Sequence, residues 1–285
     1  MKPTSQENIE AINYLKFMVR TYDGITDLIT GTKQRLLQMN PEVNPKNDFL
    51  LGGENGTKGL EAVKGALVRR MEKELIHWPL WTQWLKQVPG IGPSFGAKLI
   101  VMYYYKFVPV CECGTGLIKQ EGTFWCETCQ KSSKGEGNTK YKVVERDFPC
   151  ISSWWKFMGV HCDAEGRKPK RKAGVVCDWS TAGRTLAYLI GTSFMKLSPE
   201  KCLYRDFYDA RIVKRLKTHP DATKMHRMNM ARNEAGRLFL AHMWTVARTL
   251  DGKPVSLPYA FTIMGHSEDH YIKPPYFEGV AEKAA

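Results

Sequence analysis

A short turn rich in glycine and proline joins two stretches that have the apolar spacing of helices. Residues 88–99 read VPGIGPSFGAKL, and a further apolar run follows. Gly90 and Gly92 can adopt a positive φ and allow another backbone to come close. Pro93 suits the first turn of a helix, where its missing N–H costs nothing. The sequence therefore predicts two helices connected by a tight Pro-Gly-Ile-Gly turn.

The amides that open the second of these helices are expected to face outward. They would lie at the positive end of the helix dipole, where an anion binds. This pattern is typical of the helix-hairpin-helix, which binds a nucleic-acid backbone without reading its sequence. A plain corner between two packed helices is the alternative. The residues predicted to contact nucleic acid here are Gly90, Ile91, Gly92, Ser94 and Lys98.

The chain carries a net charge of +13 over 285 residues, and 43% of its residues are hydrophobic and can form a core. A strongly basic protein favours a polyanionic partner, and nucleic acid is the commonest. No apolar run is long enough to span a membrane, and the N-terminus lacks the apolar stretch of a signal peptide. We therefore expect a cytoplasmic, nucleoid-associated protein that binds DNA or a structured RNA and no membrane.

Apolar residues recur at helical spacing over most of the chain, which predicts a mostly α fold. Two long helices, at about 6–39 and 58–87, are expected to form an antiparallel hairpin or coiled coil within 1–87. This hairpin would suit a homo-oligomer, and two separate helices of a globular core are the alternative. The other predicted units are a helical domain over 88–106 and 141–252, an insertion at 107–140 and a loop-rich tail at 253–285. Further helices are expected at about 151–158, 181–194, 199–218 and 226–249.

Two closely spaced cysteine pairs lie in the polar insertion, with turn residues between them. Two tight turns can bring four thiolates into the tetrahedral arrangement of a zinc ribbon, with Zn–S distances of about 2.3 Å. Because sulfur would fill all four positions, such a zinc is expected to be structural; buried free thiols are the alternative. His161, Cys162 and Cys177 form a weaker candidate second site, which ordinary packing explains better. The predicted zinc ligands are Cys111, Cys113, Cys126 and Cys129.

A basic loop lies between two helical stretches, and its side chains would contact phosphates without reading sequence. A solvated charged surface is the alternative. A second basic series, from Arg205 to Arg232, lies on predicted helices and would continue the same face. The predicted phosphate-contacting residues are Arg167, Lys168, Lys170, Arg171 and Lys172 of the loop, with Arg184 on the helix after it.

Three segments of the chain resemble the bridge-RNA-guided insertion-sequence transposases. Residues 85–92 (LKQVPGIG) resemble the start of that family's C-terminal domain, 147–160 (DFPCISSWWKFMGV) resemble a segment ending in A-F-A-G-L, and 180–186 (STAGRTL) resemble an S-K-x-G turn. The two N-terminal helices would correspond to the family's coiled-coil hairpin. The resemblance covers about residues 10–250 and implies a transposase-like domain that handles DNA.

The chain departs from that family in three ways. It begins at the coiled coil, so the four acidic residues of the family's resolvase-like nuclease have no counterpart. The cysteine-containing segment is an insertion, and the position of the family's nucleophilic serine reads Asp163-Ala164-Glu165-Gly166. A carboxylate there cannot form the serine–DNA linkage of such recombinases. Ser180 is the nearest serine down the chain, a weak nucleophile candidate that a helix-capping role also explains.

The sequence thus favours a transposase-like protein of a mobile element or phage that binds a nucleic-acid backbone without cutting chemistry of its own. An active recombinase that uses a displaced serine, or a separate nuclease partner, is the second hypothesis. A structural or regulatory protein that acts through its coiled coil is the third.

Overall fold

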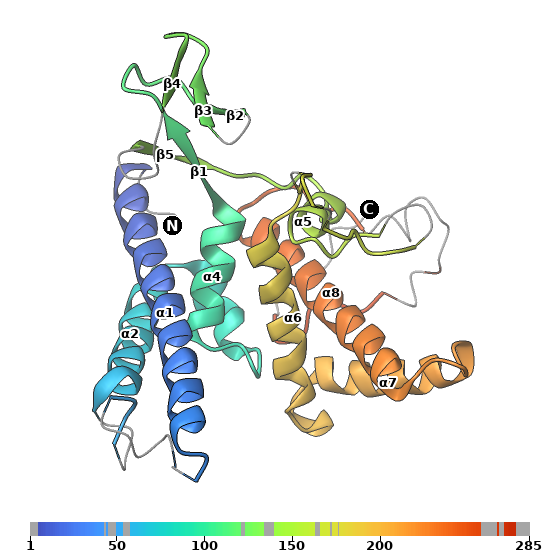
Figure 1. Cartoon of the computed structure of the whole chain (residues 1–285). Coiled ribbons are helices and arrows are strands. Elements are labelled where there is room, and N and C mark those ends of the chain that lie inside the picture. The colour runs from blue at the N-terminus through green and yellow to red at the C-terminus, as the bar shows by residue number, and fades with distance from the viewer. Residues whose placement is uncertain are drawn as a thin grey trace.

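The computed structural model describes residues 5–42, 44, 50–53, 58–120, 123–133, 140–162, 166–171, 173–175, 177–257, 267 and 271–277. Over these residues the protein is mostly helical, as predicted, with two small antiparallel sheets. Figure 1 shows two groups of helices side by side, one blue to green and one gold to orange. The strands project beyond one end of the first group (Figure 1).

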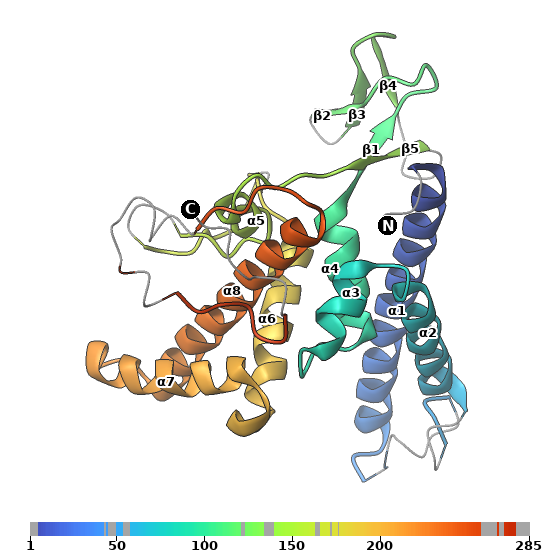
Figure 2. The ribbon, with the colours of Figure 1, turned by 180° about the vertical axis from the view of Figure 1, so that it is seen from behind.

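The first group is a helical hairpin packed on a third helix. α1 (Ser5–Met39) and α2 (Gly59–Leu75) run antiparallel, as expected, and α4 (Pro93–Tyr104) lies against both (Figures 1 and 2). Ile12 of α1 and Met71 of α2 are fully buried, in the same hydrophobic cluster as the core of the second group. The hairpin therefore belongs to the main core of the protein.

The prediction of one helix over 58–87 is wrong, because the structure breaks this segment into three pieces. α2 ends at Leu75, and Trp78 is extended before the short helices α3 (Pro79–Gln83) and η2 (Leu85–Gln87). Pro79 lacks the N–H that a continuing helix needs, and it disfavours a helical residue before it. It suits the first position of a new helix instead.

The second group is arranged around α8 (Lys224–Leu250), whose second half is almost wholly buried. The shorter helices α5 (Ile151–Phe157), α6 (Thr181–Met195) and α7 (Leu203–Thr218) all contact it, and a 3-10 turn, η3 (Pro199–Lys201), precedes α7. These bounds agree closely with the predicted helices after residue 150. The short turn η3 replaces the start of the helix that was expected over 199–218.

Aromatic side chains join the two groups of helices. The rings of Phe194, Tyr204 and Phe239 pack with centroids 4.7–5.5 Å apart. Trp84, between α3 and η2, stacks on Phe239 with its centroid 5.5 Å away. Such ring pairs contribute about 1 kcal/mol each beyond the area that they bury. The aromatic cluster therefore fixes the segment between α3 and η2 relative to α8.

The strands form a stalk with a small three-stranded sheet at its tip. β1 (Tyr105–Val110) continues directly from α4 and pairs antiparallel with β5 (Lys140–Glu145), from Tyr105 opposite Glu145 to Val110 opposite Lys140. Between them, β2 (Ile118–Gln120), β3 (Thr123–Cys126) and β4 (Lys131–Ser133) form the sheet in the order β2-β3-β4. The insertion predicted at 107–140 is thus a β element, and the stalk extends it to Tyr105 and Glu145.

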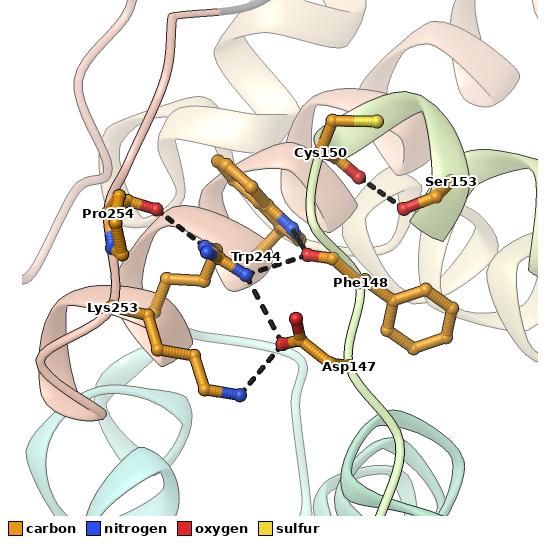
Figure 3. Close-up of polar contacts among 8 residues, drawn as sticks. Asp147, Phe148, Cys150, Ser153, Trp244, Lys253 and Pro254 are labelled. Atoms are coloured by element: carbon orange, nitrogen blue, oxygen red, sulfur yellow. Dashed lines mark hydrogen bonds and ion pairs between the residues drawn. The ribbon is translucent and has the colours of Figure 1, made fainter.

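After the stalk, the chain returns to the C-terminal end of α8 through a cluster of polar contacts around Asp147 (Figure 3). The Asp147 carboxylate accepts from Lys253 Nζ at 2.7 Å and from Arg248 Nη1 at 3.3 Å. Arg248 also donates to the carbonyl oxygens of Phe148 (3.0 Å) and Pro254 (2.6 Å). The hydrogen bond from Lys253 holds the pKa of Asp147 below its usual value. We call these five residues the Asp147 cluster.

The described parts of the C-terminal tail have no helix or strand, as predicted for 253–285, and residues 271–277 pack against the core. Trp84 Nε1 donates to the carbonyl oxygen of Pro275 at 2.7 Å. Buried His242 lies between the carbonyl oxygen of Ile272 (2.8 Å) and the hydroxyl of Tyr204 (2.9 Å). Because a carbonyl can only accept, His242 Nε2 donates to Ile272 and Nδ1 accepts from Tyr204. Burial lowers the pKa of His242 to about 4, which keeps the ring neutral.

Candidate phosphate-binding pocket and metal centre

Two of the predicted phosphate-contacting residues, Lys168 and Arg184, line one pocket together with Arg232. The pocket has a volume of about 460 Å³ and lies between the basic loop, the first half of α6 and the middle of α8. We call it the cation pocket. Its other lining residues are Val160, Thr185, Ala187, Tyr188, Asn229, Asn233 and Gly236.

The close approach of α6 to α8 holds Arg232 in the wall of the pocket. A Cβ atom added at Gly191 of α6 would lie only 2.8 Å from Arg232 Cγ and 2.9 Å from its carbonyl oxygen. The Arg232 residue is 9% exposed, and its guanidinium carbon lies 3.8 Å from the centroid of the Tyr188 ring. Its Nε atom is buried without a hydrogen-bond partner. Because Arg232 lines the pocket, the other N–H groups of its guanidinium can donate to a ligand oxygen there.

Arg184 ties the basic loop to the start of α6. Its Nη1 atom donates to the carbonyl oxygen of Pro169 at 2.5 Å, and its guanidinium carbon lies 4.9 Å from the centroid of the Trp179 ring. Ser180 forms the N-cap of α6, since its Oγ accepts from the amide of Gly183 at 3.0 Å. The weak nucleophile candidate thus has the capping role that the sequence also suggested.

The charged side chains that line the cation pocket are all basic. Burial lowers the pKa of the Lys168 ammonium to about 8, and the charges of Arg184, Arg237 and Arg232 add to this effect. Arg237 of α8 packs over the Trp155 ring, and its Nε atom is also buried without a hydrogen-bond partner. Within the described part of the chain, no carboxylate forms an ion pair with any of these four cations. One buried and three half-buried cations without a counterion are typical of an anion-binding site.

The other predicted basic residues are distributed differently. Arg167, Lys170 and Arg171 are exposed beside the pocket, whereas Lys172 and the 163–165 segment lie outside the described residues. In the second basic series, Arg205 pairs with Asp209, and both Arg211 and Arg215 pair with Glu234. The pocket residues of α8 that sequence reasoning did not select are Asn229, Asn233 and Gly236. With Arg232 they follow an i, i+3, i+4, i+7 pattern, a polar stripe that could have indicated one functional face.

The Pro-Gly-Ile-Gly turn packs against neighbouring helices of the protein. Gly90 has the expected positive φ (+87°), whereas Gly92 is extended at φ −90°. Ser193 Oγ of α6 donates to the Gly90 carbonyl at 2.8 Å, and a Cβ atom at Gly90 would lie 2.9 Å from that hydroxyl. Ile91 is buried, and Lys98 forms an ion pair with Asp23 of α1. These contacts favour the packed corner over a helix-hairpin-helix, with Gly92 and Ser94 left partly exposed.

The four predicted zinc ligands come together at the base of the three-stranded sheet. Their sulfur atoms all lie within 4.8 Å of one another, with Cys111 and Cys129 3.8 Å apart and Cys113 and Cys126 3.7 Å apart. Four sulfurs at about 2.3 Å from one tetrahedral ion lie roughly 3.8 Å from each other. The cluster therefore has the spacing of a metal centre, and its residues fit a structural zinc.

Two turns shape this cysteine cluster. Gly114 adopts φ +86°, its amide donates to the Cys111 carbonyl at 2.9 Å, and the Cys111 amide donates to the Thr115 carbonyl at 2.9 Å. In the second turn the Cys129 amide donates to Cys126 Sγ at 3.4 Å, as expected around a metal-bound sulfur. By contrast, the structure does not bring His161, Cys162 and Cys177 together: within the described residues the four cysteines are the one group of metal-binding side chains.

No helix in the described part of the chain is both long and apolar enough to cross a membrane. A comparison with protein-family models finds none that matches, and comparisons with curated proteins and with solved structures find no match either.

Proposed function

We propose that this protein binds nucleic acid through phosphate groups held in the cation pocket. The observation that carries the proposal is the group of Lys168, Arg184 and Arg232 around one cavity, with no acidic partner among the described residues. Burying a cation without a counterion costs free energy, and a bound anion recovers it. The pocket therefore suits a negatively charged ligand.

Three further features favour nucleic acid over a small inorganic anion. The chain carries a net charge of +13, which raises the local concentration of any polyanion. Exposed Lys170 and Arg171 extend the positive surface beyond the pocket. A nucleic-acid backbone carries further phosphates that these side chains can contact. Asn229, Asn233 and Tyr188 supply the amide and aromatic groups that contact sugars and bases.

The resemblance to bridge-RNA-guided transposases supports the same proposal at a finer level. In this proposal the protein holds DNA or a structured RNA of a mobile element, as an oligomer or beside a separate nuclease. The chemistry of strand transfer is not assigned to Ser180, because its hydroxyl accepts a hydrogen bond from the amide of Gly183 and caps α6.

We also propose that the cysteine cluster holds zinc. With four sulfur ligands such an ion has no open position, so its role is to fix the tip of the stalk. Because ligation energy is folding energy at such a site, a chelator should lower the melting temperature of the protein. Cys126→Ser should remove the metal, measured by elemental analysis, whereas Cys177→Ser should retain it. A full-length protein without zinc would contradict this assignment.

The binding proposal is tested by titrating labelled single-stranded DNA, duplex DNA and RNA over a range of salt concentrations. The logarithm of the affinity should fall linearly with the logarithm of the salt concentration. Lys168→Gln and Arg184→Gln should each weaken binding about tenfold, since each removes a charge-assisted hydrogen bond. Lys73→Gln, which removes an equal charge from an exposed position in the last turn of α2, is the matched control. No binding to any of these, or an affinity independent of salt, would overturn the proposal.

A further inference from the structure

The shape of the cation pocket restricts which phosphate it can take. Contacts to the backbone of a duplex come from side chains that reach outward from an exposed surface. Arg232 is 9% exposed and lies beneath the Tyr188 ring, and half-buried Lys168 lines the same pocket. A ligand that reaches both must enter the cavity, which an unbroken double helix cannot do.

The charge of the pocket also favours a phosphate at the end of a strand. A phosphodiester within a strand carries one negative charge, whereas a terminal phosphomonoester carries about 1.5 to 2 at neutral pH and has three acceptor oxygens. Lys168, Arg184 and Arg232 line the cavity, and Arg237 is near enough to influence Lys168 electrostatically. Three cations around one cavity match three terminal oxygens better than they match the two free oxygens of a diester.

The rest of the lining suits the nucleoside that carries this phosphate. A volume of about 460 Å³ falls in the range of small-molecule sites and exceeds what one phosphate needs. Asn229 and Asn233 come from one face of α8, and their amides can both donate to and accept from a base or sugar. Tyr188 is 48% exposed, so part of its ring remains open to the ligand.

From these observations we infer that the cation pocket receives the phosphorylated end of a nucleic-acid strand, with a terminal phosphomonoester on Lys168, Arg184 and Arg232. The terminal nucleoside lies along Tyr188, Asn229 and Asn233. This inference rests on the proposed nucleic-acid binding and goes beyond it, because it names the part of the strand that is bound. A free nucleoside monophosphate has the same chemistry and is distinguished by experiment.

The test compares single strands of one sequence, labelled internally, with a 5′-phosphate, a 3′-phosphate or hydroxyl groups at both ends. We expect that either the 5′-phosphate or the 3′-phosphate increases the affinity of the strand at least tenfold over the strand with two hydroxyl ends. Lys168→Gln should abolish this difference, and Lys73→Gln should retain it. Arg232→Met should also abolish it, provided that its circular dichroism matches the wild type; Lys168→Gln decides the matter if it does not.

Competition separates the possible sources of the phosphate. A nucleoside monophosphate should displace the phosphorylated strand at a lower concentration than inorganic phosphate does, and the nucleoside alone should not displace it. Equal, salt-dependent affinity for phosphorylated and hydroxyl ends would overturn this inference while the proposed function stands. Failure of every strand to bind would overturn both. Displacement by inorganic phosphate as effective as by the nucleotide would overturn the assignment of Tyr188, Asn229 and Asn233.

Discussion

Helix α8 places two arginines in nearly buried positions, and their surroundings differ in one respect. Arg248 is 7% exposed and has a carboxylate, Asp147, and two backbone carbonyls as partners (Figure 3). Arg232 is 9% exposed and lies against a tyrosine ring, with its Nε unpartnered and other cations around it. The comparison teaches that burial alone does not define a binding site. What separates a structural cation from a ligand-binding one is whether the protein itself supplies the counterion.

Replacing each arginine with methionine gives the largest expected difference between the two regions. Arg248→Met should reduce the free energy of unfolding by about 3 kcal/mol, since it removes charge-assisted hydrogen bonds and leaves the Pro254 carbonyl without its donor. Arg232→Met should cost less than about 1 kcal/mol or even stabilise the protein without ligand, because a buried unpaired charge disappears. Urea unfolding of both variants measures these values.

A similar loss of stability in both variants would break the comparison. It would mean that Arg232 has a structural partner in the folded protein, and the cation pocket would then lose its main argument. Trp244→Phe is a useful reference for the first region, because Trp244 Nε1 donates to the same Phe148 carbonyl at 2.8 Å without any charge. Because Trp244 is fully buried, its cost should combine about 1 kcal/mol for a neutral hydrogen bond with the cost of the cavity that the smaller ring leaves.

The pH dependence of strand binding tests the cation pocket through Lys168, and the expected change in affinity is of intermediate size. With the pKa of Lys168 at about 8 in the free protein, a bound anion raises it, so binding takes up a proton. Affinity should therefore be nearly constant from pH 6.5 to 7.5 and fall about tenfold by pH 9.5.

Two variants isolate the group responsible. Lys168→Arg should retain binding and lose the pH dependence, since its charge no longer titrates. Cys162 lies close enough to influence Lys168 electrostatically, and its Sγ lies 3.6 Å from Arg237 Nη1. Cys162→Ser should leave the decline in affinity unchanged. A pH profile that becomes flat in Cys162→Ser would assign the effect to the thiol instead.

The sequence predicted local structure well and tertiary contacts poorly, for physical reasons. Helical periodicity located α4, α6 and α8 to within a few residues, because one apolar face of each helix must meet the core. The cysteine spacing located the four-cysteine cluster, because the ligands of one ion must lie close together. Pro79 itself indicates a break in the helix, but the apolar pattern continues on both sides of it and predicted a single helix.

The periodicity of apolar residues could not predict which distant segments of the chain pair with each other. β1 and β5 are separated by about thirty residues, and each is too short and mixed to indicate a partner. The cation pocket likewise combines a loop, the start of α6 and the middle of α8, so Arg232 could be grouped with Lys168 only in three dimensions. The same limit explains the Pro-Gly-Ile-Gly turn: its glycines predicted a close approach, but not that Ser193 of α6 would be the neighbour.

The smallest expected effect lies at the exposed side of the Asp147 cluster. The Asp147 side chain is 55% exposed and Lys253 is partly exposed, so solvent screens their ion pair. Asp147→Asn should therefore cost less than about 1 kcal/mol at neutral pH. Because the folded pKa of Asp147 is below its unfolded value, the wild-type advantage is present above about pH 4 and is lost as the pH falls further.

Unfolding of wild type and Asp147→Asn at pH 7 and pH 3, in low and high salt, measures this contribution. The difference between the two proteins should shrink at pH 3 and in high salt, whereas Arg248→Met should remain destabilised under both conditions through its lost backbone hydrogen bonds. If Asp147→Asn cost as much as Arg248→Met, the carboxylate would be the main partner of Arg248. The backbone carbonyls would then be secondary, and the two arginines of α8 would differ by one acidic residue alone.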